Sequence, residues 1–270
     1  MATVLRTWNL FHGNTKPPGR RAHVAEMVRI AAEGADVVLL QELPVWSFGH
    51  LEAWSGLRAF PVVAQRPTLG PLPGNAELGR VVTELHHGLL RSAFTGQGNA
   101  ILVAQRLRPR EHQAIPLNPW QFRRAQAEWL RLPLVARLAW AKERRVVQAL
   151  RLEPEPGQTL LVANLHATSY PADSRLAEAE LVRAAAFADG LARRAEPLVL
   201  GGDFNVRAGS PTLHELTRPD WGFTGGSPHG IDHILVRGGE ASPPNRWPPG
   251  RRRRGARLLS DHAPVEVTLP

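Results

Sequence analysis

The chain has 270 residues and 43% of them are hydrophobic, which is enough to bury a sizeable core. It has no cysteine, so disulfides and thiolate metal sites are excluded and any metal must use oxygen or nitrogen ligands. The net charge of +9 favours a polyanionic partner such as nucleic acid or a membrane surface, although arginine supplies all but two of the 33 basic residues and this skew also resembles a codon bias.

The N-terminal part of the chain predicts a strand, a helix and two buried strands. Residues 2–10 alternate enough to form a strand, and residues 20–33 place apolar side chains at helical spacing. The short apolar runs 36–42 and 98–104 are typical of buried strands. Residues 61–75, which lie between these two runs, are expected to be irregular.

The middle of the chain predicts two neighbouring strands after an irregular segment. The irregular segment surrounds Trp120, Trp129 and Trp140. Residues 145–152 and 159–166 are then predicted to form strands, because a turn with proline and glycine separates them.

The C-terminal part predicts a long helix and three strands. Residues 173–194 form the clearest amphipathic pattern. Residues 198–201, 231–236 and 263–269 are predicted to be buried strands, and residues 241–255 to be irregular. The apolar face of the helix is expected to contain Leu176, Ala179, Val182, Ala186 and Leu191.

The organisation of the chain indicates one domain over residues 1–270, because neither an internal repeat nor a long linker occurs. Strands this apolar must be covered on both faces, which predicts an α/β fold of packed sheets with helices outside. The N-terminus lacks the pattern of a signal peptide, and no apolar run reaches the roughly 18 residues of a membrane helix. We expect a cytoplasmic monomer without a membrane span.

Unusual polar residues stand at or near the ends of the predicted strands. Each has an ordinary explanation when taken alone, such as a turn or a solvated strand end. In a layered α/β sheet, however, polar groups at strand ends converge on one edge, where ligands bind. The residues are Asn9, Glu42, Asn164, His166, Asp203, Asn205, Asp232, Asp261 and His262.

Together these residues would place four carboxylates, three side-chain amides and two histidines at one edge. Such crowding needs a cation to offset the repulsion between the carboxylates. Oxygen ligands fit a hard ion, and Mg²⁺ takes one or two carboxylates while it keeps waters for a phosphate. The pattern therefore indicates a Mg²⁺ site.

Eight short motifs follow one another between residues 4 and 267. They are Thr7-Trp-Asn-Leu, Gln41-Glu42, Gly98-Asn-Ala-Ile-Leu, Arg145 before Val-Val-Gln-Ala, Asn164-Leu-His, Gly201-Gly-Asp-Phe-Asn, Gly230-Ile-Asp-His-Ile and Ser260-Asp-His-Ala-Pro-Val. This order resembles the endonuclease/exonuclease/phosphatase superfamily, which includes deoxyribonuclease I and the abasic-site endonucleases. The resemblance implies a four-layer α/β/β/α sandwich, in which helices flank two packed mixed β-sheets, and a metal-dependent phosphoester hydrolase.

The resemblance also implies roles for the residues around the metal and the water. Glu42 matches the principal Mg²⁺ ligand, with Asn9 beside it, and Asp261 is expected to hold a second or alternate metal position. Mn²⁺ is the expected substitute. Asp203 and Asn205 match the pair that orients the attacking water.

A second group of residues is implied to contact the substrate phosphate. His262 matches the histidine that contacts the phosphate, and Asp232 matches the carboxylate that holds its ring. His166 has the position of the second histidine of the deoxyribonuclease-like branch. Arg145 and Asn164 are expected to bind phosphate. The sequence leaves open which group is the general base and which is the acid.

The residues after His166 argue against a dedicated abasic-site repair enzyme. The abasic-site branch usually carries a tyrosine followed by Val-Pro-Asn there, whereas this chain has Ala167-Thr-Ser-Tyr170. Its form is closer to the Asn-x-His of deoxyribonucleases and phosphatases.

Two enzyme classes remain for the substrate. The basic run from Arg251 to Arg254 and the arginines near the tryptophans favour a nuclease acting on DNA or RNA, although a solvated loop and core packing explain such features more often. The alternative is a phosphatase or phosphodiesterase for small phosphorylated metabolites or lipid headgroups. A non-catalytic binding protein of the same fold would lack some of the ligands, and none is missing.

Overall fold

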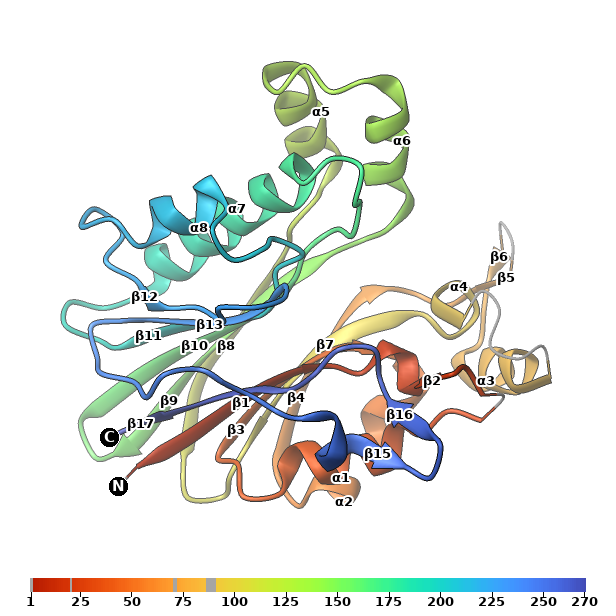
Figure 1. Cartoon of the computed structure of the whole chain (residues 1–270), viewed down its shortest axis with the longest axis horizontal. Coiled ribbons are helices and arrows are strands. Elements are labelled where there is room, and N and C mark those ends of the chain that lie inside the picture. Colours follow the sequence, from red (N-terminus) through yellow and green to blue (C-terminus); the bar gives the residue numbers. More distant parts are fainter. Residues whose placement is uncertain (1, 20, 70–71, 86–90) are drawn as a thin grey trace.

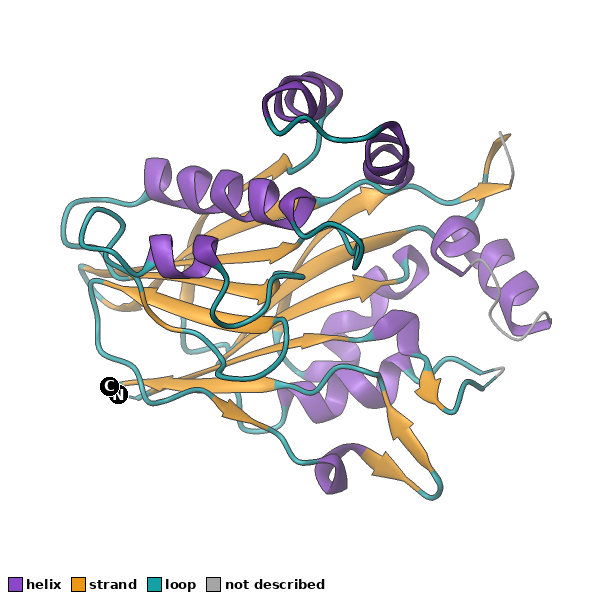
Figure 2. Cartoon of the chain, turned by 45° about the horizontal axis from the view of Figure 1, so that its top comes forward, coloured by secondary structure: helices purple, strands orange, loops and turns teal. Residues whose placement is uncertain are grey.

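The computed structural model describes residues 2–19, 21–69, 72–85 and 91–270. Within these residues, two six-stranded sheets pack face to face and helices cover their outer sides (Figure 1, Figure 2). The prediction of an α/β/β/α sandwich is confirmed.

The sheets mix parallel and antiparallel strands. The first contains, in spatial order, β14 (Asn245–Arg246), β17 (Val265–Leu269), β1 (Thr3–Asn9), β3 (Val37–Leu43), β7 (Gln97–Val103) and β4 (Arg58–Gln65). The second contains β12 (Thr224–Gly225), β13 (Asp232–Arg237), β11 (Leu198–Asp203), β10 (Gln158–His166), β9 (Val146–Glu155) and β8 (Arg108–Pro116). Two small sheets are formed by β15 (Arg253–Arg254), β16 (Arg257–Leu259) and β2 (Thr15–Lys16), and by β5 (Thr68–Leu69) and β6 (Leu72–Pro73).

The α-helices of the described residues fall into four pairs. The pair on the first sheet is α1 (Val24–Ala32) and α2 (Leu51–Ser55), and the pair on the second is α7 (Arg175–Leu191) and α8 (Pro211–Leu216). Between β8 and β9 come α5 (Trp120–Trp129) and α6 (Leu134–Lys142), and between β6 and β7 come α3 (Ala76–Leu85) and α4 (Arg91–Thr95). Short 3-10 helices span Phe11–Gly13, Val45–His50 and Pro249–Arg252. In the part of the chain that the structure describes, none of the helices is both long and apolar enough to cross a membrane.

The sheets enclose an apolar core because their strands carry aliphatic side chains on both faces. Leu39 and Ile101 of the first sheet lie in one fully buried cluster with Val162, Val199 and Ile234 of the second. The opposite faces of the same strands are buried under the helices, which explains why the strand sequences show little polar alternation.

Two parallel strand pairs bring residues that are distant in sequence to the same end of the sandwich. In the pair β1–β3, Asn9 lies opposite Gln41, and in the pair β10–β11, His166 lies opposite Asp203. The antiparallel strand β13 begins at this end, with Asp232 opposite Asp203. The polar residues of the strand ends therefore share one edge.

The prediction that the tryptophan-rich segment is irregular is wrong, because α5 and α6 form there. Each helix follows a proline at its N-cap, Pro119 and Pro133, whose backbone is extended. Trp140 and Ala136 of α6 are buried against Leu176 at the start of α7. The helices depend on this contact with α7, which the local pattern does not reveal.

The predicted apolar face of the long helix is also wrong in part. Val182 is 42% exposed, and Ala186 is exposed as well. The buried face instead contains Ala177, Leu181, Ala184, Ala185 and Ala188. Small alanine side chains allow the helix to lie close to the second sheet, so the larger apolar residues do not mark the buried side.

Other segments predicted to be irregular are partly ordered. Residues 61–65 belong to β4, and β5 and β6 form a hairpin, while residues 70 and 71 lie outside the described residues. Residues 241–255 contain only short strands and one 3-10 helix. The sequence pattern does not predict β8, because this strand is largely exposed and has no apolar run.

Candidate active site

The site is built on strand ends from both sheets. Asn9 is the last residue of β1 and Glu42 the penultimate residue of β3, where its backbone is left-handed (φ 53°). His166 and Asp203 end β10 and β11. All four side chains come from strand ends at the same edge of the sandwich. Residues separated by more than 150 positions, such as Asn9 and Asp203, therefore meet there.

Asn9 links the carboxylates of the two sheets. Its Nδ2 donates to Glu42 Oε1 at 3.1 Å and to Asp203 Oδ2 at 2.8 Å. Its Oδ1 accepts from the backbone N–H of Phe11 at 2.9 Å. The side chain is fully buried, so these bonds hold Glu42 and Asp203 at fixed positions on either side of Asn9.

His262 and Asp232 form a directly bonded pair. His262 Nδ1 lies 2.9 Å from both carboxylate oxygens of Asp232, and its Nε2 lies 3.8 Å from Asp203 Oδ2. Burial alone would lower the pKa of His262. The negative charge of Asp232 and its hydrogen bond, with Asp203 and Asp261 nearby, instead raise this pKa to about 10. The ring is therefore a cation at neutral pH.

The loop that carries His262 is fixed from both sides. Ser260 is left-handed (φ 57°), and its hydroxyl donates to the carbonyl of Asn9 at 2.7 Å while it accepts from the His262 N–H at 3.0 Å. Trp8 Nε1 donates to the His262 carbonyl at 3.0 Å. These bonds tie the imidazole to the end of β1.

Asp203 lies at the centre of the contacts. The backbone N–H of Asn205, two residues further along the chain, donates to Asp203 Oδ1 at 3.0 Å, and the Asn205 side chain donates to the carbonyl of Ala167 at 2.9 Å. Burial and then the charge of Asp232 raise the pKa of Asp203 to about 7, although His262 and Asn9 oppose the shift. A carboxylate with this pKa exchanges a proton readily near neutral pH.

His166 and Arg145 lie on the other side of Asp203. His166 Nε2 is 3.5 Å from Glu42 Oε1 and 3.5 Å from Asp203 Oδ2. Arg145 Nη1 lies 2.7 Å from His166 Nδ1, and Arg145 also pairs with Glu143. Complete burial and the adjacent Arg145 cation hold the pKa of His166 well below its ordinary value. The ring is thus neutral and can accept the arginine N–H.

Asp261 lies at the outer side of this cluster of site residues, next to His262. Its Oδ1 lies 4.0 Å from His262 Nε2, and its Oδ2 lies 3.6 Å from Lys16 Nζ. The Oδ1 atom is buried and has no hydrogen-bond partner among the described residues. Contacts thus run without a break from Glu42 through Asn9, Asp203 and His262 to Asp261.

The side chain of Asn164 has a different environment from the one expected. It is fully buried, and its Nδ2 donates to the carbonyls of Leu40 and Ala100 at 3.1 and 3.0 Å. Its Oδ1 accepts from Gln41 Nε2 at 2.7 Å. Both amide protons are therefore used to join the two sheets, which leaves neither for a phosphate and corrects the expectation that Asn164 binds one.

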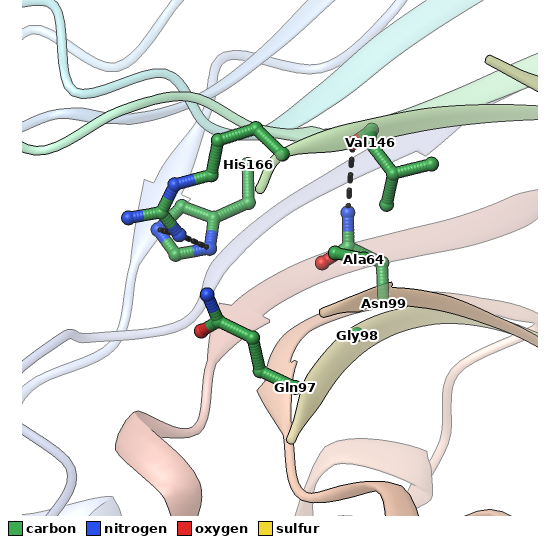
Figure 3. A pocket seen from close by; sticks show the side chains of 7 residues that line it. Ala64, Gln97, Gly98, Asn99, Val146 and His166 are labelled. Atoms are coloured by element: carbon green, nitrogen blue, oxygen red, sulfur yellow. Dashed lines mark hydrogen bonds between the residues drawn. The ribbon is translucent and has the colours of Figure 1, made fainter. Parts of the chain in front are cut away.

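Three polar residues near the site are not predicted by the sequence pattern. His12 Nε2 lies 3.6 Å from Glu42 Oε2, and Lys16 contacts Asp261 as described above. Gln97, the first residue of β7, lines a small hollow together with Arg145 and His166 (Figure 3). The spacing of His12 after Asn9 is the single local signal, because the partners of Lys16 and Gln97 are distant in sequence.

The donor set fits a divalent cation. One carboxylate oxygen each of Asp203 and Asp232 and a ring nitrogen of His262 lie within 4.8 Å of one another, and of these the carboxylate oxygens are free to bind a cation while the His262 ring is protonated. Burial is the main cause of the raised pKa of Asp203, and the charges of Asp232 and Glu42 add to it. Together with the unpartnered Asp261 Oδ1, these charges indicate that negative charge is not fully compensated by the described residues. Because Asp232 is already bonded to His262, the oxygens of Glu42 and Asp261 are the freer donors for a hard ion.

Comparison with known proteins gives one family and several similar structures. The family model described as "Endonuclease/Exonuclease/phosphatase family" matches residues 7–262. An endonuclease/exonuclease/phosphatase protein from Bacteroides vulgatus is 13% identical, with a TM-score of 0.64 over 100% of this chain and 99% of that chain. The human Nocturnin catalytic domain with bound sulfate anion is 15% identical, with a TM-score of 0.63 over 100% and 94%. TDP2 from C. elegans is 16% identical, with a TM-score of 0.62 over 100% and 75%. No curated protein matches.

Proposed function

Because this chain belongs to the endonuclease/exonuclease/phosphatase family, we propose that it is a magnesium-dependent hydrolase that cleaves phosphodiester bonds of nucleic acids. The observation that carries the proposal is the continuous group of contacts from Glu42 to Asp261, which has Asp203 at its centre and includes the Asp232–His262 pair. A buried carboxylate group of this kind is suited to a cation and a phosphate and has no evident structural use.

Glu42, Asn9 and Asp261 would hold the metal. When it is bound, Mg²⁺ would neutralise charge on the non-bridging phosphate oxygens, and Mn²⁺ would substitute because it prefers the same ligands. The side chain of Asn9 accepts one backbone N–H and otherwise fixes the position of Glu42, so we assign the larger share of metal binding to the carboxylates.

The other residues would act on the water and the phosphate. Asp203, whose pKa near 7 permits proton exchange, would aim or deprotonate the attacking water, with Asn205 fixing its carboxylate. The cationic ring of His262 would contact the phosphate oxygens, and Asp232 would hold that ring in one tautomer. The Arg145 guanidinium would offset charge on the opposite side, and the neutral ring of His166 would accept its N–H and hold it in place.

A second candidate is a phosphatase or phosphodiesterase for small phosphorylated metabolites or lipid headgroups. Exposed aliphatic side chains, including Leu78 and Leu138, occur in the segments that flank the site. Nucleic-acid contacts do not need such side chains. For this second candidate, the observation therefore favours lipid headgroups over small metabolites as substrates.

The test is a hydrolysis assay with plasmid DNA, single-stranded DNA, RNA and bis-p-nitrophenyl phosphate. We expect turnover with Mg²⁺ or Mn²⁺ and little with Ca²⁺. Activity should be lost in EDTA and return when Mg²⁺ is restored, because without a cation the carboxylates repel the phosphate. For the nuclease, the apparent affinity for DNA should also fall steeply as salt rises. Protein that stays inert toward every phosphoester with both metals would refute the proposal.

Gln97 offers a prediction about substrate binding. Gln97 Nε2 and Arg145 Nε are buried donors with no hydrogen-bond partner among the described residues, and both belong to the hollow beside His166 (Figure 3). We expect Gln97→Leu to lower kcat/KM by about tenfold or more, since a hydrogen bond to a charged oxygen is lost. Steady-state kinetics with bis-p-nitrophenyl phosphate measure this effect.

The matched control is Gln105→Leu, at an exposed position beyond the far end of β7. It should retain the wild-type kcat/KM. Equal kinetics for Gln97→Leu and Gln105→Leu, with both proteins folded, would show that Gln97 does not contact the substrate.

A further inference from the structure

Large hydrophobic side chains are exposed mainly in two segments of the described chain, residues 63–81 and 120–138. The second segment belongs to α5 and α6, which with their connection we call the arm (residues 120–142). In the arm, Trp129 is 77% exposed, and Leu134, Val135 and Leu138 are 71, 62 and 63% exposed. Such side chains in one place indicate a surface that meets an apolar partner.

The helix α6 is apolar on two opposite faces. Ala136 and Trp140 point inward and are buried against Leu176. Leu134 and Leu138 are one helical turn apart on the opposite face, with Val135 beside them. One face therefore fixes the arm to α7, and the other has no packing partner among the described residues.

The arm lies beside the site. It ends at Lys142, just before Arg145, and Figure 1 shows α5 and α6 projecting beyond the second sheet. Val63 and Ala64 of β4 line one hollow together with Arg144 and Arg145. Val63, an exposed residue of the first segment, thus lies beside the residues that directly follow the arm.

The arm is also cationic. Exposed basic residues on it and directly after it are Arg124, Arg131, Arg137, Lys142 and Arg144, whereas Glu128 and Glu143 are its acidic residues. Glu128 pairs with Arg124, and Glu143 with Arg145. An apolar face of leucine and valine on α6, with the exposed Trp129 on α5 and exposed basic residues on the same arm, is the combination that binds at the interface of an anionic bilayer.

We propose that the arm docks this protein on the surface of membranes that contain anionic lipids. The outer face of α6 enters the boundary between headgroups and acyl chains, and the basic residues contact lipid phosphates. Two other occupants fit less well. A second copy of the chain would bring another cationic arm against this one, and nucleic acid would gain little from Leu134, Val135 and Leu138, which do not stack on bases.

Docking is independent of hydrolysis, so it is tested with the full chain and no substrate. The probe is co-sedimentation with sucrose-loaded vesicles of phosphatidylcholine alone or of phosphatidylcholine and phosphatidylserine in a two-to-one ratio. We expect binding to the anionic vesicles that weakens as salt rises. The variant Leu134→Ser/Val135→Ser/Leu138→Ser should bind at least about tenfold more weakly, because its apolar contact is lost.

The matched control is Val182→Ser, which changes an exposed aliphatic residue of α7 outside the arm and should bind like the wild type. Arg131→Gln/Lys142→Gln should reduce binding to anionic vesicles while thermal unfolding is unchanged. Hydrolysis of bis-p-nitrophenyl phosphate, or thermal unfolding if the chain is inactive, checks that each variant is folded.

Three outcomes would overturn the docking proposal. One is wild-type protein that stays in the supernatant with anionic vesicles, and another is equal binding by the triple serine variant. The third is that neither the wild type nor the triple serine variant binds vesicles, and the variant instead loses DNA binding or self-association. Loss of DNA binding would assign the face to nucleic acid, and loss of self-association would assign it to a second copy of the chain. None of these outcomes bears on the hydrolase activity.

Discussion

A Glu42→Gln variant is expected to hydrolyse phosphodiesters about 10²–10³-fold more slowly in kcat/KM than the wild type. Glutamine has the same shape and can still meet Asn9, whose Nδ2 donates to Glu42 Oε1 at 3.1 Å. The substitution therefore removes a negative charge and leaves the packing intact. Since a hard cation depends on carboxylate charge, the Mg²⁺ concentration at half-maximal activity should rise together with the loss of rate.

Steady-state kinetics over a Mg²⁺ titration measure both effects. The matched control is Glu240→Gln, because Glu240 is exposed and lines a hollow with the two ends of the chain, at the other end of the strands. If Glu42→Gln keeps wild-type kcat/KM and the same Mg²⁺ dependence, Glu42 is not a metal ligand. Thermal unfolding of both variants excludes a general loss of structure.

His262→Ala is expected to reduce kcat by about 10²–10³-fold, because it removes the partly buried cation that we propose contacts the phosphate. The ring lies 2.9 Å from Asp232 and 3.8 Å from Asp203. Its removal leaves both carboxylates without their cationic neighbour, so the pKa of Asp203 should rise further above its ordinary value. Kinetics at saturating substrate give the loss in kcat.

Asp232→Asn separates the position of the ring from its charge. Asparagine can still accept from His262 Nδ1, but the attraction that raises the pKa of His262 to about 10 is lost. In metal-free protein we expect this pKa to fall by about one to three pH units, as followed by NMR of the imidazole. The histidine cation is then lost at lower pH than in the wild type, so the activity of the variant should decline at the alkaline side of the pH profile.

An unchanged pKa for His262 in Asp232→Asn would show that other groups keep the ring charged. Asp220→Asn, at an exposed position, serves as the control for the loss of one carboxylate.

The sequence predicts the strands well because a strand buried on both faces has a continuous apolar run, which is visible in the local pattern. The runs at residues 36–42, 98–104 and 198–201 are apolar without alternation, and in the structure helices and the other sheet cover both faces. The same pattern fails for α5, α6 and the buried face of α7, because these depend on contacts with elements elsewhere in the chain.

The residues of the site were predicted as members of a group, and their individual environments were not. Asn164 and Asn9 are both amides at strand ends, yet Asn164 joins the sheets and Asn9 joins Glu42 to Asp203. Lys16 meets Asp261 across nearly the whole length of the chain. Neither the spacing nor the residue types distinguish these cases.

The sequence alone determined the class of fold, the family, and which polar residues end the strands, since these depend on short-range patterns and motifs that can be recognised without the tertiary structure. Only the tertiary structure decided which metal-ligand atoms remain free and how far the pKa values of Asp203 and His262 are raised. It also decided that the outer face of the arm is exposed. These properties depend on burial and on the distances between charges, and both are set by how segments that are remote in sequence pack together.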